Sequence, residues 1–444
     1  MKDRRLLEAA KEVLGANWVG SSTVPSSSLY PHQWSWDSAF ITIGRSWYDQ
    51  GRAQEEFEQL LRGQWSDGRI PHIVFNPSVP DDAYFPGPAF WRSSEIARAP
   101  RNIETSGIIQ PPLHAAAALE IYDHAQDPTE ARAFLERVYP RLESWHAYLA
   151  GHRDPDDIGL AAILHPWESG LDNSPAWDQA LEDLEVRDDL LPAYERRDLA
   201  ASEADDRPTD DAYRRFVYLA AAYREVEYDD ERLCRSSPFV VAGPLLNAIL
   251  IWSSIALARI AHLVGDDPQS HVARAATVRD GIQATLWHAE DARYYSRNLR
   301  TDRLLRDPSI LSFMPLLDPE LPMEGRNAIV RDLSAPCFHP PESEEHYLIP
   351  SYDLTGEHFD PRRYWRGPVW LNTDWLVWRG LLQHGEHELA GHVADSMLAL
   401  VERSGFREYF NPFTGEGHGS EGFAWSAALV IDVIERRART GSAA

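Results

Sequence analysis

Apolar and polar positions alternate with a helical period from one end of the chain to the other. Apolar residues recur three and four positions apart, as in amphipathic helices that bury one face. This pattern predicts helices over 6–14, 54–61, 113–124, 129–149, 211–226, 244–264, 271–286, 387–401 and 422–439. Runs with a strand period are few, and 70–75 fits a loop or a minor strand. The predicted fold class is therefore all-α.

Long segments rich in Pro, Gly, Trp and Asp separate the predicted helices. They cover 21–36, 76–100, 164–177, 188–208, 337–370 and 407–421. Loops of this length are uncommon in a compact protein unless they carry function. Paired helices with elaborate loops on one face favour a closed α/α barrel. We expect one catalytic domain over residues 1–444, with loop insertions around 76–100 and 188–208.

Composition is that of a full-sized soluble protein. The chain has 444 residues, 43% of them hydrophobic and 25% charged, so it can bury a large core. Its most apolar segment, 244–264, contains Asn247, Ser253, Ser254 and Arg259, which favours a buried helix over a membrane span. The N-terminal residues lack an apolar secretory core, and two cysteines cannot build a disulfide framework. We therefore expect a cytoplasmic protein without membrane contact.

Charge and residue usage exclude several partners and cofactors. Acidic residues number 69 against 43 basic ones, and the net charge of −26 opposes binding to nucleic acid or anionic lipid. Every basic residue except Lys2 and Lys11 is an arginine, so most of the chain offers no lysine for a Schiff base or a P-loop. His384, His387 and His392 lack the HExxH pattern, so no metal site is predicted.

Tryptophan and tyrosine are the informative residue types. The chain contains 16 Trp and 17 Tyr, whose side chains combine a flat apolar face with a polar group. Sugar rings stack on such faces, although large aromatic residues also fill the core of a helical protein. Their clustering beside acidic and glycine-rich loops favours a carbohydrate site.

One acidic cluster is HPWESGLDNSPAWD at 165–178, with three carboxylates and two tryptophans around a glycine. Crowding beside apolar rings and like charges raises the pKa of a carboxyl group, which keeps a general acid protonated near neutral pH. Alternatively, Asp172 or Asn173 caps the next helix at Ser174. The motif by itself leaves both interpretations open.

A second acidic candidate lies in FREYFNPFTGEGHG at 406–419, just before the last predicted helix. Aromatic residues and Arg407 flank Glu408, and an ionised carboxylate there could activate a water molecule as a general base. The alternative is a surface contact between Glu408 and arginine, which would contribute little to stability.

Two further motifs place aromatic residues around a polar group, YPHQWSWDSAF at 30–40 and RYWRGPVW at 363–370. In the first, Asp37 could accept two sugar hydroxyls while Trp34 or Trp36 stacks on the ring. Alternatively, Asp37 is an N-cap and the tryptophans are core residues.

In this order, HQWSWDSAF, HPWESGLDNSPAWD, YWRGPVW and EYFNPFTGEG resemble glycoside hydrolase family 63, in the trehalase-like clan of (α/α)6 barrels. The resemblance covers nearly the whole chain, and WESGxDNSP is most similar to bacterial glucosylglycerate and mannosylglycerate hydrolases. It implies an inverting α-glycosidase that releases hexose and glycerate without metal or organic cofactor. Alternatives are an exo-α-glucosidase for neutral di- or oligosaccharides and a sugar-binding barrel without catalysis.

The resemblance also implies roles for individual residues. The family's general acid falls on Asp172 and its general base on Glu408, which in an inverting enzyme stand about 6.5–9.5 Å apart. The residues expected to bind the sugar are Trp34, Trp36, Asp37, His72, Tyr364, Trp365, Gly367 and Trp370.

For the aglycone, the resemblance implies a carboxylate held by an arginine. The residues in comparable segments are Arg207, Tyr30, Tyr84, Gln110 and Tyr213. A guanidinium group suits a carboxylate, and a chain this acidic needs a local donor to hold an anion. Alternatively, Arg207 pairs with Asp205, Asp206 or Asp210. One departure is Asp374, where the family favours an amide. The choice between glucose and mannose and the oligomeric state stay open.

Overall fold

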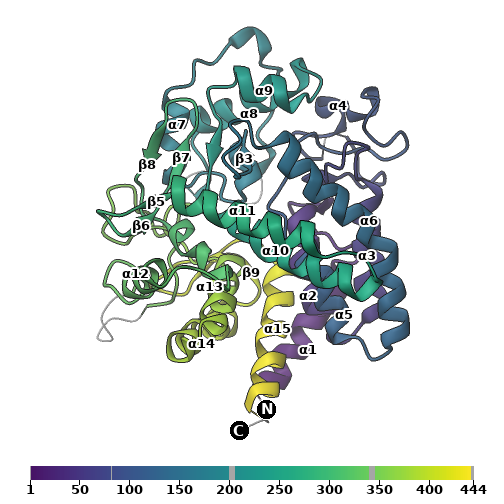
Figure 1. The fold of residues 1–444 in the computed structure, drawn as a ribbon, viewed down its shortest axis with the longest axis vertical. Coiled ribbons are helices and arrows are strands. Elements are labelled where there is room, and N and C mark those ends of the chain that lie inside the picture. The colour runs from purple at the N-terminus through teal and green to yellow at the C-terminus, as the bar shows by residue number, and fades with distance from the viewer. Residues whose placement is uncertain (1, 82, 200–205, 340–345, 442–444) are drawn as a thin grey trace.

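The computed structural model describes residues 2–81, 83–199, 206–339 and 346–441, and these residues are mostly helical (Figure 1). The α-helices are α1 (Lys2–Ala16), α2 (Ser35–Arg45), α3 (Gln50–Arg62), α4 (Pro88–Trp91), α5 (His114–His124), α6 (Pro128–His152), α7 (Asp178–Glu182), α8 (Asp210–Glu225), α9 (Asp230–Ser236), α10 (Pro244–Val264), α11 (Gln269–Thr285), α12 (Met323–Leu333), α13 (Leu371–Gln383), α14 (His387–Ser404) and α15 (Ala424–Gly441). All nine helices predicted from periodicity are present, and the all-α class is confirmed.

Six helical elements of the described chain form a closed inner ring. They are α2, α5, α10, the 3-10 helix η7 (Ile310–Leu317), α13 and α15; each contacts the next, and α15 returns to α2. The elements α1, α3, α6, α11, α12 and α14 pack against members of this ring and alternate with them along the chain. The architecture is therefore the predicted (α/α)6 barrel, closed by helices from opposite ends of the sequence.

Helix α10 is a core member of the ring. By length and composition it could cross a membrane, but 83% of its most apolar window is buried inside the protein. The Asn247 side chain bonds to backbone groups of Ala161 and Gly243, and Ser253 and Ser254 both bond to His146. These partners satisfy the buried polar groups that interrupt the apolar segment, as a core helix requires.

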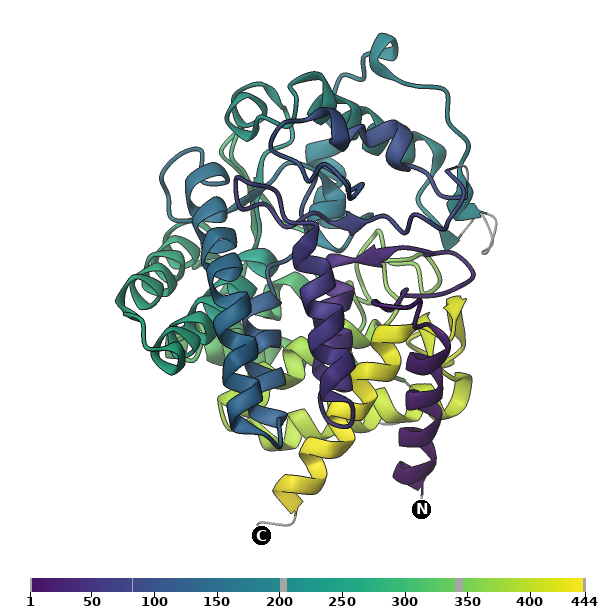
Figure 2. The ribbon, with the colours of Figure 1, turned by 90° about the vertical axis from the view of Figure 1, so that its right-hand side faces the viewer.

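Two long excursions from the barrel lie at the end of the molecule opposite the termini. They connect α3 to α5 and α6 to α10, and they occupy the upper part of Figures 1 and 2 while both termini lie below. The short strands are β1 (Gln33–Trp34), β2 (Ile73–Val74), β3 (Ala162–Ile163), β4 (Val241–Ala242), β5 (Trp287–His288), β6 (Arg293–Tyr294), β7 (Ser296–Asn298), β8 (Arg303–Leu305), β9 (Arg407–Phe410) and β10 (Gly417–Glu421).

These strands pair locally and brace the excursions. Strand β1 pairs with β2, so the 70–75 segment contributes the minor strand that was expected. Strands β3, β4, β7 and β8 form one antiparallel sheet, in that order, and β5 pairs with β6. The 407–421 segment, predicted as a loop, is a hairpin in which β9 pairs with β10 and the register shifts between His418 and Glu421.

Helical periodicity misses the inner helices α2 and α13. All residues of α2 are buried, and so are most residues of α13. Their polar residues are buried together with the apolar ones, for example Asp37 and Arg45 in α2 and Asp374 in α13, so these polar positions do not mark a solvent face. Helix α2 begins within the 30–40 motif and α13 begins directly after the 363–370 motif. The sequence analysis therefore assigned these regions to loops.

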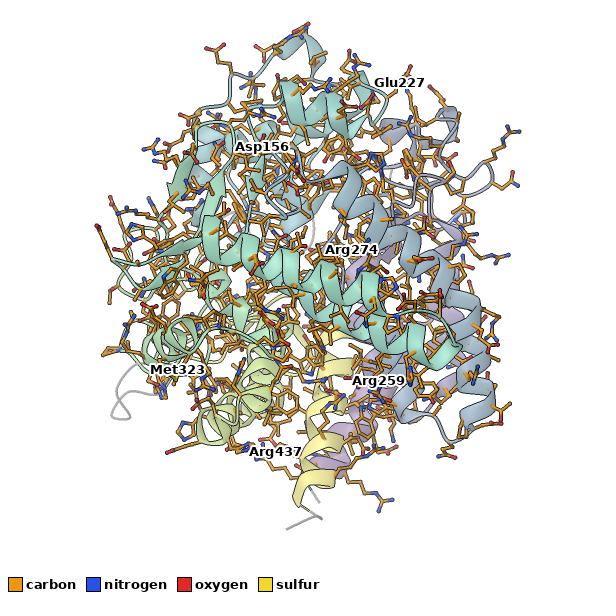
Figure 3. The ribbon with its side chains drawn as sticks, in the orientation of Figure 1. Asp156, Glu227, Arg259, Arg274, Met323 and Arg437 are labelled. Atoms are coloured by element: carbon orange, nitrogen blue, oxygen red, sulfur yellow. The ribbon has the colours of Figure 1, made fainter. Side chains whose placement is uncertain are left out.

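Charged side chains cover the outside of the molecule (Figure 3). Arg259 of α10 pairs with Asp123 at 2.8 Å and Arg437 of α15 pairs with Asp395 at 2.6 Å. Both pairs are partly exposed, so each contributes little to the free energy of unfolding.

Asp374 lies in the first turn of α13 and is fully buried. Its Oδ2 accepts a hydrogen bond from the Ile349 backbone N–H at 3.1 Å, and no hydrogen-bond partner for Oδ1 is found among the described residues. Burial raises the pKa of this carboxyl group well above its usual value of 3.8. A protonated Asp374 offers one donor and one acceptor, as an amide does, which explains how it replaces the amide expected from the family resemblance.

We expect Asp374→Asn to stabilise the protein more at about pH 8 than at about pH 4. The pKa of Asp374 is higher in the folded than in the unfolded chain, so its stability contribution is complete below the unfolded value and is lost as the pH rises toward the folded one. Thermal unfolding of both proteins at the two pH values measures the difference. An equal shift in Tm at both pH values would contradict a protonated Asp374.

Candidate active site

A cavity lies where the two excursions meet the start of α2 and the β9–β10 hairpin. Its walls are aromatic, with a few polar groups among them, as is usual for a small-molecule site. The predicted residues that line it are Tyr30, Trp34, Trp36, Asp37, His72, Tyr84, Gln110, Asp172, Arg207, Tyr213, Tyr364, Trp365 and Glu408. The structure therefore brings both proposed catalytic carboxyls and most of the proposed binding residues into one cavity.

Glu408 projects from β9 and is 1% exposed. Its Oε1 accepts hydrogen bonds from the hydroxyls of Tyr30 at 2.7 Å and Tyr364 at 3.1 Å. Its Oε2 accepts from the Ser420 backbone N–H at 3.0 Å and from Nη2 of Arg207 at 3.3 Å. Four donors, one of them positively charged, stabilise the ionised carboxylate that a general base requires. The alternative considered from the sequence was a surface contact between Glu408 and arginine, whereas the structure shows a buried Glu408 bonded to Arg207.

Asp172 lies in the turn after the 3-10 helix η2 (Pro166–Ser169). Gly170 between them has φ +76°, and a side chain there would collide with the Trp36 ring, so the ESG sequence needs glycine at this point. Burial, and to a lesser degree the nearby Glu408, raise the pKa of Asp172 to about 7, although Arg207 opposes the shift. Asp172 is therefore a carboxyl group that keeps its proton close to neutral pH.

The other two carboxylates of the same motif have structural partners. Glu168 is fully buried and forms a two-pronged ion pair with Arg153, with both N–O distances 2.8 Å. It also accepts from the Tyr223 hydroxyl at 2.7 Å, and Asp178 pairs with Arg366. Asp172 is thus the carboxyl of this motif that faces the cavity.

The next helix is capped by Ser174 and not by Asp172 or Asn173. Ser174 caps η3 (Pro175–Trp177) by accepting a hydrogen bond from the Ala176 N–H. Asn173 accepts one from the Trp365 backbone N–H at 3.0 Å and so ties the 165–178 motif to the 363–370 motif. Asp172 itself is left to line the cavity.

Asp37 and the adjacent tryptophans form the wall contributed by α2. Asp37 lies in the first turn of this helix, but Trp34 occupies the N-cap position, so Asp37 is not the N-cap. Burial raises the pKa of Asp37 well above its usual value, and the negative charges of Glu408 and Asp172 add to the shift. Trp34 and Trp36 are core residues and also line the cavity, and their stacking on a sugar ring stays a prediction.

His72 and Gln110 add polar groups beside the tryptophans. His72 meets Trp34 edge-on with ring centroids 6.3 Å apart, and burial lowers the pKa of its imidazole to about 3. His72 is therefore neutral and can donate or accept a hydrogen bond without carrying charge. Gln110 accepts a hydrogen bond from the Trp36 backbone N–H at 3.2 Å, which fixes the orientation of its amide.

Arg207 is buried beside the base, with Nη2 3.3 Å from Oε2 of Glu408. Besides Glu408, it donates from Nη1 to the Tyr30 hydroxyl at 3.0 Å. Asp206 lies 3.3 Å from Nε of Arg362, and Asp210 lies 2.8 Å from Nη1 of Arg196. The third partner considered from the sequence, Asp205, lies outside the described residues.

Two predicted sugar-binding residues, Trp370 and Gly367, are not among the residues that line the cavity. The Trp370 ring stacks on Trp365 with ring centroids 3.8 Å apart and on Tyr409 with centroids 4.7 Å apart. Gly367 has φ +158°, and a side chain there would collide with Phe359 and the Asp360 carbonyl. Trp370 therefore supports the Trp365 wall, and Gly367 serves the close packing of the loop.

Several lining residues were not predicted: Pro25, Leu29, Phe85, Trp167, Gly170, Asp198, Pro208, Phe216, Phe423 and Trp425. Trp167 belongs to the 165–178 motif and could have been chosen with Asp172. Phe216 is one of many buried apolar residues of α8, and nothing local distinguishes it. Among the described residues, no group of three or more His, Cys, Asp or Glu is placed to hold a metal ion.

Comparison with known proteins agrees with this geometry. A family model for the mannosylglycerate hydrolase MGH1-like glycoside hydrolase domain matches residues 30–426. A mannosylglycerate hydrolase of Rubrobacter radiotolerans is 40% identical over 97% of this chain and 96% of its own length. A glucosylglycerate hydrolase of Mycolicibacterium hassiacum is 37% identical over 96% of this chain and 97% of its own.

A solved structure extends the similarity to three dimensions. The GH63 mannosylglycerate hydrolase from Thermus thermophilus, in complex with Tris and D-glycerate, superposes with a TM-score of 0.88 at 40% identity. The match covers 96% of this chain and 99% of that one. The barrel, its two carboxyls and these relatives define a glycoside hydrolase, an enzyme that cleaves O-glycosyl bonds. The chain belongs to the mannosylglycerate hydrolase MGH1-like family, within glycoside hydrolase family 63.

The contrast between Glu168 and Asp172 gives a stability prediction. Glu168→Gln removes one of the two carboxylates that pair with the buried Arg153 guanidinium, and Asp230 at 3.4 Å remains, so we expect the free energy of unfolding to fall by about 3 kcal/mol. Asp172→Asn removes a group whose charged form is disfavoured by burial, so stability at about pH 8 should be unchanged or higher. Denaturant unfolding measures both. Equal losses in the two variants would show that Asp172 is also a structural carboxylate.

Proposed function

We propose that the protein hydrolyses the α-glycosidic bond of mannosylglycerate or glucosylglycerate and releases hexose and glycerate with inversion at the anomeric carbon. The observation that carries this proposal is a single cavity that holds a carboxyl with a raised pKa, a carboxylate with four donors and a guanidinium group. Relatives with these two activities in their names, and a structural relative with D-glycerate bound, support the choice of substrate.

The two carboxyls supply the acid and the base of an inverting hydrolysis. Protonated Asp172 gives its proton to the glycosidic oxygen, and the bond between this oxygen and the anomeric carbon breaks. Glu408 takes a proton from a water molecule whose oxygen bonds to the opposite face of the anomeric carbon. One water is consumed, Asp172 ends ionised and Glu408 ends protonated, and solvent exchange restores both.

The remaining walls divide into a sugar side and an aglycone side. Trp34, Trp36 and Asp37 offer flat faces and hydrogen bonds to the hexose. Among the described lining residues, Arg207 is the one Lys or Arg, so it is the group that would hold the glycerate carboxylate. Tyr84 and Tyr213 line the same cavity. Tyr213 belongs to α8, the helix that begins shortly after Arg207.

We expect the protein to cleave mannosylglycerate, glucosylglycerate or both, and to leave trehalose and maltose intact. Proton NMR of each reaction also identifies the anomer of free hexose that forms first, and inversion predicts the β-anomer. Hydrolysis of the neutral disaccharides alone would favour the exo-α-glucosidase alternative. Stoichiometric binding without product would favour the sugar-binding barrel.

Two variants test the assignment of the acid and the base. Asp172→Asn and Glu408→Gln should each lower kcat by about 10³-fold, since a positioned acid or base contributes about 10²–10⁴-fold. Glu136→Gln is a matched control, because Glu136 pairs with Arg132 on the surface and both side chains are about half exposed. Near-normal turnover in either cavity variant would remove that residue from the mechanism.

A further inference from the structure

All acceptor positions of the Glu408 carboxylate are occupied by hydrogen-bond donors from the described residues. A carboxylate offers about four acceptor sites, and here Tyr30, Tyr364, Ser420 and Arg207 donate to it. A general base must accept a hydrogen bond from the water that it deprotonates. One of the four donors therefore has to leave before Glu408 can act.

Three of these donors are held in place by their surroundings. The Ser420 N–H belongs to strand β10, which is paired with β9. Tyr364 packs edge-on against Trp370 and Tyr409, with ring centroids 4.9 and 5.5 Å away. Tyr30 packs edge-on against Trp34 and Phe423. A shift of any of these would disturb the core around the base.

Arg207 is the donor that substrate can draw away. Its contact with Glu408, at 3.3 Å, is the longest of the four. The guanidinium group lies over the ring of Tyr364, 4.6 Å from its centroid, and lines the cavity. Because it is positively charged, an anion in the cavity competes with Glu408 for it. The neutral hydroxyls and the backbone N–H do not respond in this way.

We propose that Arg207 holds Glu408 inactive in the absence of substrate and that the carboxylate of the aglycone withdraws Arg207 from Oε2. The attacking water then takes the vacated acceptor position. This inference rests on the proposed function and deepens it, because the aglycone that Arg207 recognises also frees the base. In this role Arg207 is a positioning residue that acts through Glu408.

A movement of Arg207 away from Glu408 affects two of the four donors, Arg207 itself and Tyr30. Its Nη1 bonds to the Tyr30 hydroxyl, which itself donates to Oε1 of Glu408. Withdrawal therefore removes one hydrogen bond from Glu408 and releases Tyr30 from a positively charged neighbour. A neutral glycoside has no carboxylate to withdraw Arg207, so Arg207 stays bonded to Glu408. The enzyme then discriminates against neutral glycosides through a lower kcat as well as through weaker binding.

The test uses α-D-mannosyl fluoride and α-D-glucosyl fluoride as neutral substrates. Fluoride is a small leaving group that needs little help from a general acid, so its release reports on Glu408 and the water. The variants are Arg207→Met and Arg207→Gln, so that one remains if the other fails to fold. Arg362→Met is the matched control, because Arg362 pairs with the neighbouring Asp206 and does not line the cavity.

Loss of the guanidinium group should change the two kinds of substrate in opposite directions. We expect kcat on the glycosyl fluoride to rise by about 3- to 10-fold, and kcat/KM on the glycerate conjugate to fall by about 10- to 100-fold. When the rate of glycosyl fluoride hydrolysis is plotted against pH, its fall on the acidic side should occur at higher pH in the variants, because a positive charge beside the base has gone. Arg362→Met should change neither value.

Fluoride hydrolysis that falls or stays constant in both Arg207 variants, with an unmoved acidic limb, would overturn the proposal. A failure of the proposed function is distinguishable, because the wild-type protein would then leave both glycerate conjugates intact. A purely structural role of Arg207 would lower turnover of both kinds of substrate and would not move the pH profile.

Discussion

Asp172 and Glu408 share one buried cavity and have to hold opposite protonation states, and this constraint organises the whole site. Burial keeps Asp172 protonated, because its pKa is raised to about 7. Glu408 is less exposed than Asp172, at 1%, but four donors, including Arg207, stabilise its charge. The difference between acid and base thus comes from hydrogen bonding and charge rather than from depth in the protein.

The barrel makes this arrangement possible by joining distant parts of the sequence. Tyr30 and Glu408 are 378 residues apart and bond directly, because α15 closes the ring against α2. Asp172 and Arg207 come from the excursion between α6 and α10, which the buried Arg153–Glu168 pair anchors. A closed ring with long excursions at one end therefore brings groups from distant parts of the sequence into the same cavity.

The sequence predicts those features that leave a local pattern. Amphipathic helices show a period, and Asp172 and Glu408 stand in crowded, aromatic motifs. The sequence leaves open which carboxylate of 165–178 faces the cavity, because the partner that occupies Glu168 is Arg153, outside the motif. It also misses α2 and α13, whose polar residues are buried and therefore do not mark a solvent face. The sequence also does not distinguish Trp370, which stacks on Trp365, from Trp365, which lines the cavity, because the two tryptophans stand in the same motif.

The most direct test of the opposed protonation states is carbon NMR of protein labelled at the aspartate carboxyl carbons, recorded across a pH series. The account predicts a resonance that titrates with a pKa of about 7 and that disappears in Asp172→Asn. A resonance assigned to Asp172 that titrates at the ordinary aspartate pKa would contradict it, since this carboxyl would then be ionised at neutral pH and could not donate a proton to the glycosidic oxygen.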